Sequence, residues 1–206
     1  DLFSEYSKLM GIEVTPEEIF DKLFKQALLA EKDGGGIVAY NYFSGEHVTG
    51  FEEGRPLFVR SPESKFTLAN FMRTNLYTCL GAMRVGLNIL IDQEHVKIDR
   101  LLGHGGLFKT KGVGQQILAD AVNAPVSVMS TAGEGGAWGI ALLAAYLVDN
   151  KDGETLDEFL DNRVIAGNEG STLDPEPEGV KGFNEFMDRY LKGLPIERAA
   201  VESKIW

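Results

Sequence analysis

Two glycine-rich turns are the residues of this sequence best suited to chemistry, and each lies between a predicted strand and a predicted helix. The first contains Gly103, Gly105 and Gly106, and the second contains Gly135 and Gly136. Glycine adopts backbone angles that side chains forbid, and it lets N–H groups approach an anion without a steric clash. Both turns could therefore bind phosphate, although tight turns and close helix packing explain such glycines equally well.

Neither turn matches a standard nucleotide-binding signature. No Gly-Lys-Ser/Thr follows, which excludes a Walker motif, and the spacing after Gly106 differs from the dinucleotide pattern G-x-G-x-x-G. Lys109 and Lys111 lie in the first turn and could face a phosphate, although a solvated lysine is the commoner arrangement. The three histidines are far apart and lack neighbouring cysteines, so we predict no metal ligands in this chain.

An alternation of strands and helices must position the two turns. We predict strands at Lys97–Leu102 and Pro125–Met129, and helices at Gly112–Val122 and Ala137–Asp149. This order is typical of a parallel sheet covered by helices and joined by right-handed crossovers. Ligands of such sheets bind beyond the carboxyl ends of the strands, which is where both glycine turns lie.

The residues before this unit predict two helices and two strands, fewer strands than a complete α/β domain needs. Thr15 followed by Pro16 is a typical helix start. Strands are favoured at Ile37–Phe43 and Leu57–Val59, and a helix from Ser64 to about Gln93 is apolar on most sides, which predicts burial. Three or four strands are few for an α/β domain of this length, so we expect further strands upstream of Asp1.

The character of the sequence changes after Asn150, where we predict a boundary between residues 1–150 and residues 151–206. The second range predicts a short helix at Leu156–Leu160, an acidic loop over Gly167–Gly179 and an amphipathic helix marked by Phe183–Leu191. Its role is not evident from the sequence. Formation of a homodimer through this appendage is one hypothesis.

Composition argues against several kinds of partner. The 206 residues are 44% hydrophobic and 25% charged, as in an ordinary globular protein, and the net charge of -11 argues against nucleic acid. The apolar stretch near residues 140–148 is too short to span a bilayer, so we expect no membrane partner. The single cysteine, Cys79, is predicted to be buried and unpaired, which favours the cytoplasm.

Several segments together resemble the C-terminal half of the FGGY carbohydrate kinases. They are Leu101–Gly106, Gln115–Asp120, Ala124–Val126 and Glu134–Ala145, with Tyr42–Glu46 similar to the family's Gly-Glu-Arg segment. The likeness covers about residues 37–146. It implies an α/β, ribonuclease-H-like lobe of the actin/hexokinase ATPase fold, truncated at its N-terminal side. Residues 1–150 would then be part of the nucleotide-binding lobe, and the rest a helical appendage.

The resemblance, together with the chemistry of the glycine turns, gives a set of expected ATP-binding residues. They are Gly103, Gly105, Gly106, Leu107, Thr110, Lys111 and Gly136. The loop between Gly106 and Asp120 is one residue longer than the common pattern, so either Thr110 or Lys111 takes the position next to the adenine.

The resemblance also implies a reaction. Such enzymes transfer the γ-phosphoryl group of ATP to a sugar hydroxyl, with Mg²⁺ bridging the phosphates. We expect a pentulose substrate, xylulose first and ribulose second, with glycerol and gluconate as alternatives. The sugar and the catalytic aspartate belong to the N-terminal lobe, so we expect no catalytic residue here and an inactive fragment. We predict solvated or capping roles for Asp99, Asp120 and Asp149.

Departures from the family pattern keep a second hypothesis open. His47 stands where the family has Arg, and the long helix keeps Arg73 but lacks the Glu-Gly pair downstream. The family's Gly-Thr-Ser phosphate turn is absent. A non-catalytic nucleotide-binding module of the same fold therefore remains an alternative to an enzyme.

Overall fold

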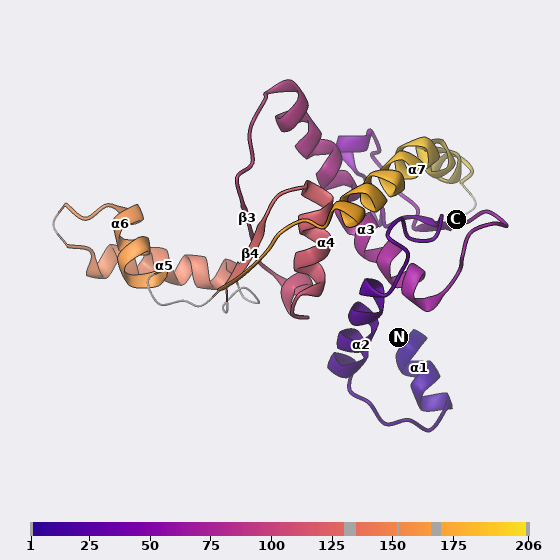
Figure 1. The fold of residues 1–206 in the computed structure, drawn as a ribbon, viewed down its shortest axis with the longest axis horizontal. Helices are drawn as coiled ribbons and strands as arrows, with labels where there is room; N and C mark the ends of the chain where they lie inside the picture. Colours follow the sequence, from indigo (N-terminus) through magenta and orange to yellow (C-terminus); the bar gives the residue numbers. More distant parts are fainter. Residues whose placement is uncertain (1, 130–134, 152, 166–169, 205–206) are drawn as a thin grey trace.

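The computed structural model describes residues 2–129, 135–151, 153–165 and 170–204 (Figure 1). The helices are α1 (Leu2–Leu9), α2 (Pro16–Leu28), α3 (Leu68–Asn88), α4 (Val113–Val122), α5 (Gly135–Asp149), α6 (Leu156–Leu160) and α7 (Pro177–Glu202). The strands are β1 (Val38–Tyr40), β2 (Leu57–Val59), β3 (Leu101–Gly103), β4 (Val126–Met129) and β5 (Gly170–Leu173). Short 3₁₀ or π turns are η1 (His47–Thr49), η2 (Ile89–Gln93), η3 (Gly106–Phe108) and η5 (Asp161–Ile165).

The predicted start of α2 is confirmed, and it has the geometry of a capping box. The Thr15 hydroxyl accepts from the Glu18 N–H at 3.2 Å, and a Glu18 carboxylate oxygen accepts from the Thr15 N–H at 2.9 Å. Two orphan N–H groups of the first turn are satisfied in this way. At the other end of the helix, the buried Arg73 of α3 donates from Nε to the Ala27 carbonyl at 2.9 Å, which ties α2 to α3.

The helix predicted from Ser64 to Gln93 is α3 followed by η2. The predicted burial is confirmed for its first part and is wrong for its last turns. Thr67 caps its start, and the side chains from Met72 to Leu80 that face the core are buried. Beyond them Ile89 and Leu90 are 46% and 47% exposed, so burial on all sides was wrong for the last turns. Cys79 also lies at the surface and not in the core, because it points away from the face formed by its buried neighbours.

The predicted parallel pair is confirmed in β3 and β4, where Leu101 is opposite Val126 and Gly103 is opposite Val128. The observed β3 begins at Leu101, four residues later than predicted. Pairing starts where β4 starts, since the Leu101 N–H donates to the Pro125 carbonyl at 2.9 Å. Lys97 instead pairs with Asp99 in a salt bridge whose side chains are both exposed.

A strand that the sequence did not predict completes this sheet. β5 lies within the range assigned to an acidic loop and pairs antiparallel with β4, so the strand order is β3-β4-β5. Its sequence, Gly-Ser-Thr-Leu, carries no run of apolar residues that would indicate a strand. β5 is extended because it pairs with β4. The hydroxyls of Ser127 and Thr172 form a hydrogen bond across the two strands at 2.7 Å. β1 and β2 form a separate antiparallel pair.

Helix α7 is longer than predicted and belongs to the main core. It passes without interruption through Pro195. Phe183 and Phe186 are fully buried against Tyr77 of α3, with ring centroids 4.9 Å and 5.2 Å from the tyrosine ring. The division at residue 150 stays a prediction about domains, but β5 and α7 of the second range pack with elements of the first. Among the described helices, none is long and apolar enough to cross a membrane.

Candidate functional site

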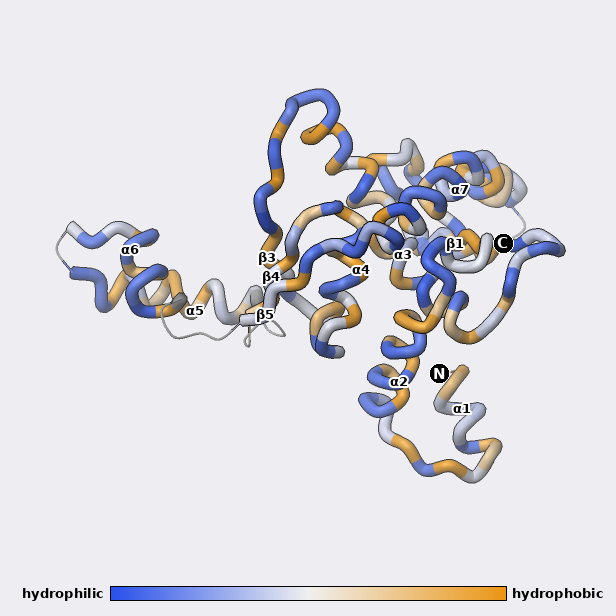
Figure 2. Tube along the Cα trace, viewed as in Figure 1, coloured by the Kyte–Doolittle hydropathy of each residue, from blue (hydrophilic) through white to orange (hydrophobic). Residues whose placement is uncertain are grey.

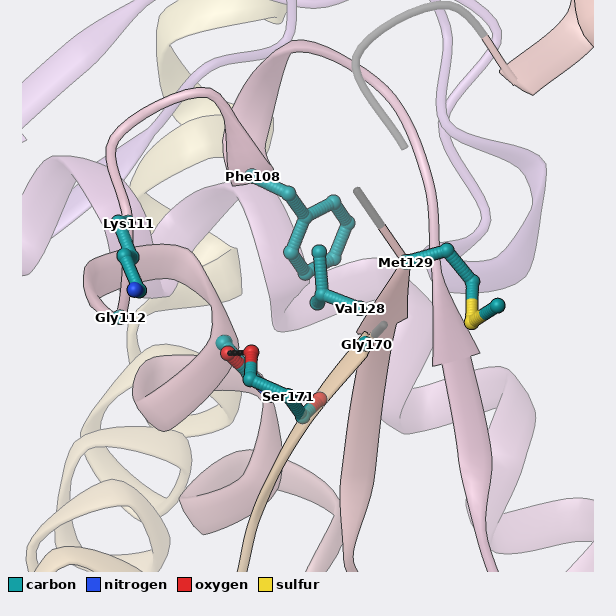
Figure 3. A pocket seen from close by; sticks show the side chains of 8 residues that line it. Phe108, Lys111, Gly112, Val128, Met129, Gly170 and Ser171 are labelled. Atoms are coloured by element: carbon teal, nitrogen blue, oxygen red, sulfur yellow. Dashed lines mark hydrogen bonds between the residues drawn. The ribbon is translucent and has the colours of Figure 1, made fainter. Parts of the chain in front are cut away.

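A cavity of about 380 Å³ opens beside the carboxyl ends of the parallel strands. Its walls come from the connection between β3 and α4, the first turn of α4, the end of β4 and the start of β5 (Figure 3). The lining residues are Phe108, Lys111, Gly112, Gln115, Val128, Met129, Gly170 and Ser171. This is the position at which open α/β sheets bind their ligands, as the sequence predicted for the first glycine turn.

The main chain at Gly105 and Gly106 is bare. Gly105 has φ 103° and ψ -173°, a conformation that only glycine adopts readily. A Cβ atom added at either glycine would meet no atom of the described residues within 4 Å. The two residues do not line the cavity themselves, but they open η3, whose last residue, Phe108, does. The connection therefore presents open backbone next to a concave surface.

Two other parts of this connection have a packing role instead. Gly103 is buried, and a Cβ there would lie 2.6 Å from the Phe108 ring. Leu107 packs against the core, and its carbonyl oxygen would lie only 2.3 Å from a Cβ added at Gly114. These glycines let η3 lie flat on β3 and α4, so close packing explains Gly103 without any ligand.

Thr110 and Lys111, the two residues predicted for the position next to an adenine, differ in their exposure. Thr110 is buried, with 8% of its surface exposed, and its carbonyl accepts from the Val113 N–H at 3.3 Å. Lys111 is exposed and lines the cavity (Figure 3). Gly136 does not line the cavity and lies in the first turn of α5. Of the predicted set, the structure brings Gly105, Gly106 and Lys111 together on one connection beside the cavity.

Gln115 is a cavity residue to which the sequence reasoning gave no role. Its side chain is buried, and its Nε2 donates to the carbonyls of Val126 and Ser171, both at 2.8 Å. The Ser171 hydroxyl donates back to Gln115 Oε1 at 3.1 Å. The side chain thus fastens α4 to β4 and β5 and fixes one wall of the cavity. No local signal in the sequence singles out Gln115, because the carbonyls that it binds belong to β4 and β5.

Among the described residues that line the cavity there is no carboxylate and no histidine. Over the described residues, no group of His, Cys, Asp and Glu is arranged to hold a metal ion. The nearby Asp120 is buried and takes part in packing. Burial raises its pKa, and hydrogen bonds from the Glu176 N–H and Gln116 oppose that shift.

Comparison with known proteins decides the family. The family model described as "FGGY family of carbohydrate kinases, C-terminal domain" matches residues 5–148. The chain belongs to this family. The match ends close to the boundary predicted at residue 150, and it contains β3, β4 and the connection that carries Gly105 and Gly106. The resemblance found in the sequence is thereby confirmed.

Individual relatives of this FGGY chain are longer than it is. A xylulose kinase from Haemophilus influenzae is 27% identical over 194 residues, which cover 94% of the chain and 37% of the relative. Among solved structures, the xylulose kinase from Rhodospirillum rubrum superposes with a TM-score of 0.62 and 20% identity over 89% of the chain and 36% of its own length. The Plasmodium falciparum glycerol kinase with ADP superposes with a TM-score of 0.60 and 18% identity, over 92% of the chain and 36% of its own length.

These superpositions confirm the expected fold class. The mixed α/β architecture of the FGGY chain is that of the kinases with the actin/hexokinase-type fold. The chain spans about a third of the length of these relatives, so the activity of the whole protein is a separate question.

Proposed function

We propose that this chain is the nucleotide-binding, C-terminal lobe of an ATP-dependent sugar kinase. The observation that carries the proposal is the bare main chain at Gly105 and Gly106, which lies beside a cavity at the carboxyl ends of β3 and β4. Backbone N–H groups in such a position bind anions, and the lack of side chains leaves room for a nucleotide phosphate. Family membership supports the same ligand.

Different residues of the cavity would contact the base and the phosphates of an adenine nucleotide. Phe108 and Val128 provide apolar surface on which a purine base can lie, and Lys111 provides a positive charge for a phosphate or for the polar edge of the ligand. Gln115 keeps the α4 wall in place. The described residues contain no cluster suited to Mg²⁺, so we propose that the ion enters on the phosphates of ATP and that its protein ligands lie elsewhere.

The intact protein would transfer the γ-phosphoryl group of ATP to a sugar hydroxyl. We propose that an N-terminal lobe supplies the sugar site and the aspartate that accepts the hydroxyl proton, because the described residues that line the cavity include no such base. Xylulose is the first substrate to test, in keeping with the xylulose kinase relative, and ribulose, glycerol and gluconate follow. A cytoplasmic location suits a chain whose one cysteine is a free thiol.

The proposal is tested in two steps. Isothermal titration of this chain with ADP is expected to show one binding site per chain. A coupled assay of ADP release by the full-length protein, with the four sugars in parallel, is expected to show turnover with xylulose above the others. If neither the chain nor the full-length protein binds ADP, the proposed nucleotide site is wrong. If the full-length protein turns over no ketose or polyol, the proposed kinase activity is wrong.

A non-catalytic nucleotide-binding module is the second candidate, and His47 is the observation that favours it. The residue begins η1, in the segment where the family pattern has Arg, and Glu46 caps the turn by accepting from the Val48 N–H at 3.3 Å. A change from guanidinium to imidazole removes a permanent charge from this segment. ADP binding by the full-length protein without turnover of any sugar would favour the module over the enzyme.

A further inference from the structure

A second cavity, of about 490 Å³, lies near the amino ends of β3 and β4. Ile98, which precedes β3, and Ala124, which precedes β4, both line it. The candidate nucleotide cavity lies beside the carboxyl ends of the same strands and shares no lining residue with this one. Cavities that bind small molecules have volumes of about 300–1,000 Å³, so this one is large enough for a ligand.

The connection from η2 to β3 forms one wall of this second cavity. In Figures 1 and 2 it belongs to the arm that rises from the end of α3 and returns to β3, and it is hydrophilic over most of its length. The Glu94 N–H donates to the Ile89 carbonyl at 3.2 Å, and the Val96 N–H donates to the Leu90 carbonyl at 2.9 Å. These bonds close a turn around His95, which has φ 55° and lines the cavity.

Arg84 of α3 brings a partly buried guanidinium to the cavity. Its Nε donates to Asn88 Oδ1 at 2.7 Å, and its Nη1 donates to the Ala121 carbonyl in the last turn of α4. A guanidinium has five N–H groups, so three take no part in these two bonds. The two bonds hold the planar group in place, and capping of α4 explains only one of them.

No carboxylate of the described residues forms an ion pair with Arg84. Burial lowers the pKa of Arg84, and the charge of Asp92 opposes that shift from a longer distance. A buried charge is costly unless it is paired, so a partly buried cation of this kind is stabilised by an anion that enters the cavity.

Two other polar side chains line the cavity together with apolar ones. The His95 ring and the Asn123 side-chain amide form no hydrogen bond or ion pair within the described part of the chain. Each has an N–H group to donate to an oxygen atom. Ile91, Ile98 and Val122 provide apolar surface in the same cavity. A ligand that fits these walls therefore combines an oxyanion with an apolar body.

The balance of charge favours a carboxylate over a phosphate. Among the described lining residues, Arg84 is the uncompensated permanent charge, because Lys97 is paired with Asp99 at 3.0 Å. The acids Asp92 and Glu94 belong to the same arm and do not line the cavity, but their charges disfavour a dianion. A carboxylate carries a single charge and matches the planar guanidinium with two parallel hydrogen bonds.

We propose that this second cavity binds a small monocarboxylate with an apolar body, whose carboxylate pairs with Arg84 and accepts from His95 and Asn123. The apolar body lies against Ile91 and Ile98. The proposal rests on these contacts and not on the nucleotide site or the kinase activity, so each can fail without the other.

Titration of the full-length protein with phenylacetate, in the presence of saturating ADP, tests the site. The backbone amide NMR signals of His95 and Asn123 are expected to shift with a dissociation constant of about 1 mM, as for other ligands of this size. Phenylacetamide, which has the same shape and no charge, is expected to bind at least about tenfold more weakly. Equal binding of the two compounds would overturn the proposal. So would the absence of any shift, or shifts confined to Lys111 and Gly112 of the nucleotide cavity.

Three variants of the full-length protein locate the carboxylate. Arg84→Gln is expected to weaken phenylacetate binding by about tenfold or more, because the paired charge is lost. Since Arg84 also caps α4, His95→Gly is a second test: it keeps the left-handed backbone, removes the ring and is expected to weaken binding about threefold.

Arg100→Gln is the matched control, because Arg100 is an exposed basic residue of the same arm and does not line the cavity. It is expected to bind phenylacetate as the wild type does. The proposal is wrong if Arg84→Gln and His95→Gly both keep the wild-type affinity. It is also wrong if Arg100→Gln loses as much affinity as Arg84→Gln, because general attraction to the arm would then explain the binding.

Discussion

The carboxylate of Asp120 in α4 accepts a hydrogen bond from the backbone N–H of Glu176 at 2.8 Å, directly before α7 begins. The same oxygen accepts from Gln116 Nε2 at 2.9 Å. The Glu176 side chain makes no cap of its own, so an acid from another helix provides the negative charge at the α7 N-terminus. Of the two roles predicted for Asp120, capping is correct and solvation is wrong, since only 1% of the residue is exposed.

This contact predicts a pH-dependent contribution to stability. Burial raises the pKa of Asp120, so the folded state holds its proton more tightly than the unfolded chain does. Its contribution is therefore greatest below the ordinary pKa of a carboxyl group and declines as the pH rises through the raised pKa. We expect the free energy of unfolding of the wild type, relative to Asp120→Asn, to fall over that window. Chemical denaturation of both proteins across the acid range measures it.

Glu18 provides a control of opposite sign. The hydrogen bond from the Thr15 backbone lowers the pKa of Glu18, so its contribution is present above the ordinary pKa and is lost as the pH falls through the lowered one. The wild type is therefore expected to gain stability relative to Glu18→Gln as the pH rises. Parallel pH profiles for the two variants would contradict the role assigned to Asp120.

The carboxylate of Asp120 also limits the space available at Gly179, in the first turn of α7. A Cβ added to Gly179 would lie 2.0 Å from Asp120 Oδ2, and the hydrogen bonds of Asp120 leave the carboxylate little freedom to move. We expect Gly179→Ala to destabilise the chain by about 1–3 kcal/mol, as overpacking of a tight site does. Thermal unfolding measures the change, and combination with Asp120→Ala is expected to recover part of it. A neutral Gly179→Ala would show that α7 can shift away.

Local signals explain how much of the fold the sequence predicts. The capping residues at Thr15 and the breaks at Gly112 and Asn123 mark helix ends, because caps and left-handed residues act within a few positions of the chain. The strand of β4 follows from its alternation with helices. The candidate glycine turn was found for the same reason, since open backbone at Gly105 and Gly106 needs only the glycines themselves.

Distant partners explain what the sequence does not predict. β5 is a strand because β4 lies beside it, and α7 is a core helix because Tyr77 and α4 provide its contacts. The role of Gln115 depends on carbonyls from β4 and β5 that are remote in the sequence. The exposure of Cys79 likewise depends on which face of α3 the other helices cover. No local pattern carries this information.

Gly106 allows a test of the nucleotide site that does not disturb the fold. Its φ is not in the left-handed region, and the position of its Cβ is open, so Gly106→Val is expected to change the free energy of unfolding by less than about 1 kcal/mol. The added side chain would occupy the room proposed for the nucleotide phosphates. We therefore expect the affinity for ADP, measured by isothermal titration, to fall by about tenfold or more.

Gly86 is the matched control for that variant. It is also a glycine with open space at its Cβ position, but it lies in α3 and outside the cavity walls. Gly86→Ala is expected to leave ADP binding unchanged and to stabilise the helix slightly, because alanine loses less backbone entropy than glycine on folding. Unchanged ADP affinity in Gly106→Val would mean that the nucleotide does not pass over this connection.

Among the described residues that line the cavity, Lys111 is the one with a charged side chain, so its removal tests whether an anionic ligand binds there. We expect Lys111→Met, which keeps most of the side chain's length, to weaken ADP binding by about tenfold, equivalent to about 1.4 kcal/mol. Lys97→Met is the control, because Lys97 is exposed, pairs with Asp99 and is not among the residues that line this cavity. Titrations at two salt concentrations add a second readout: the loss caused by Lys111→Met is expected to shrink at high salt, where screening already weakens the lysine's attraction for phosphate. Equal affinities of the two variants at both salt concentrations would show that the ligand's charge is held by some other part of the protein.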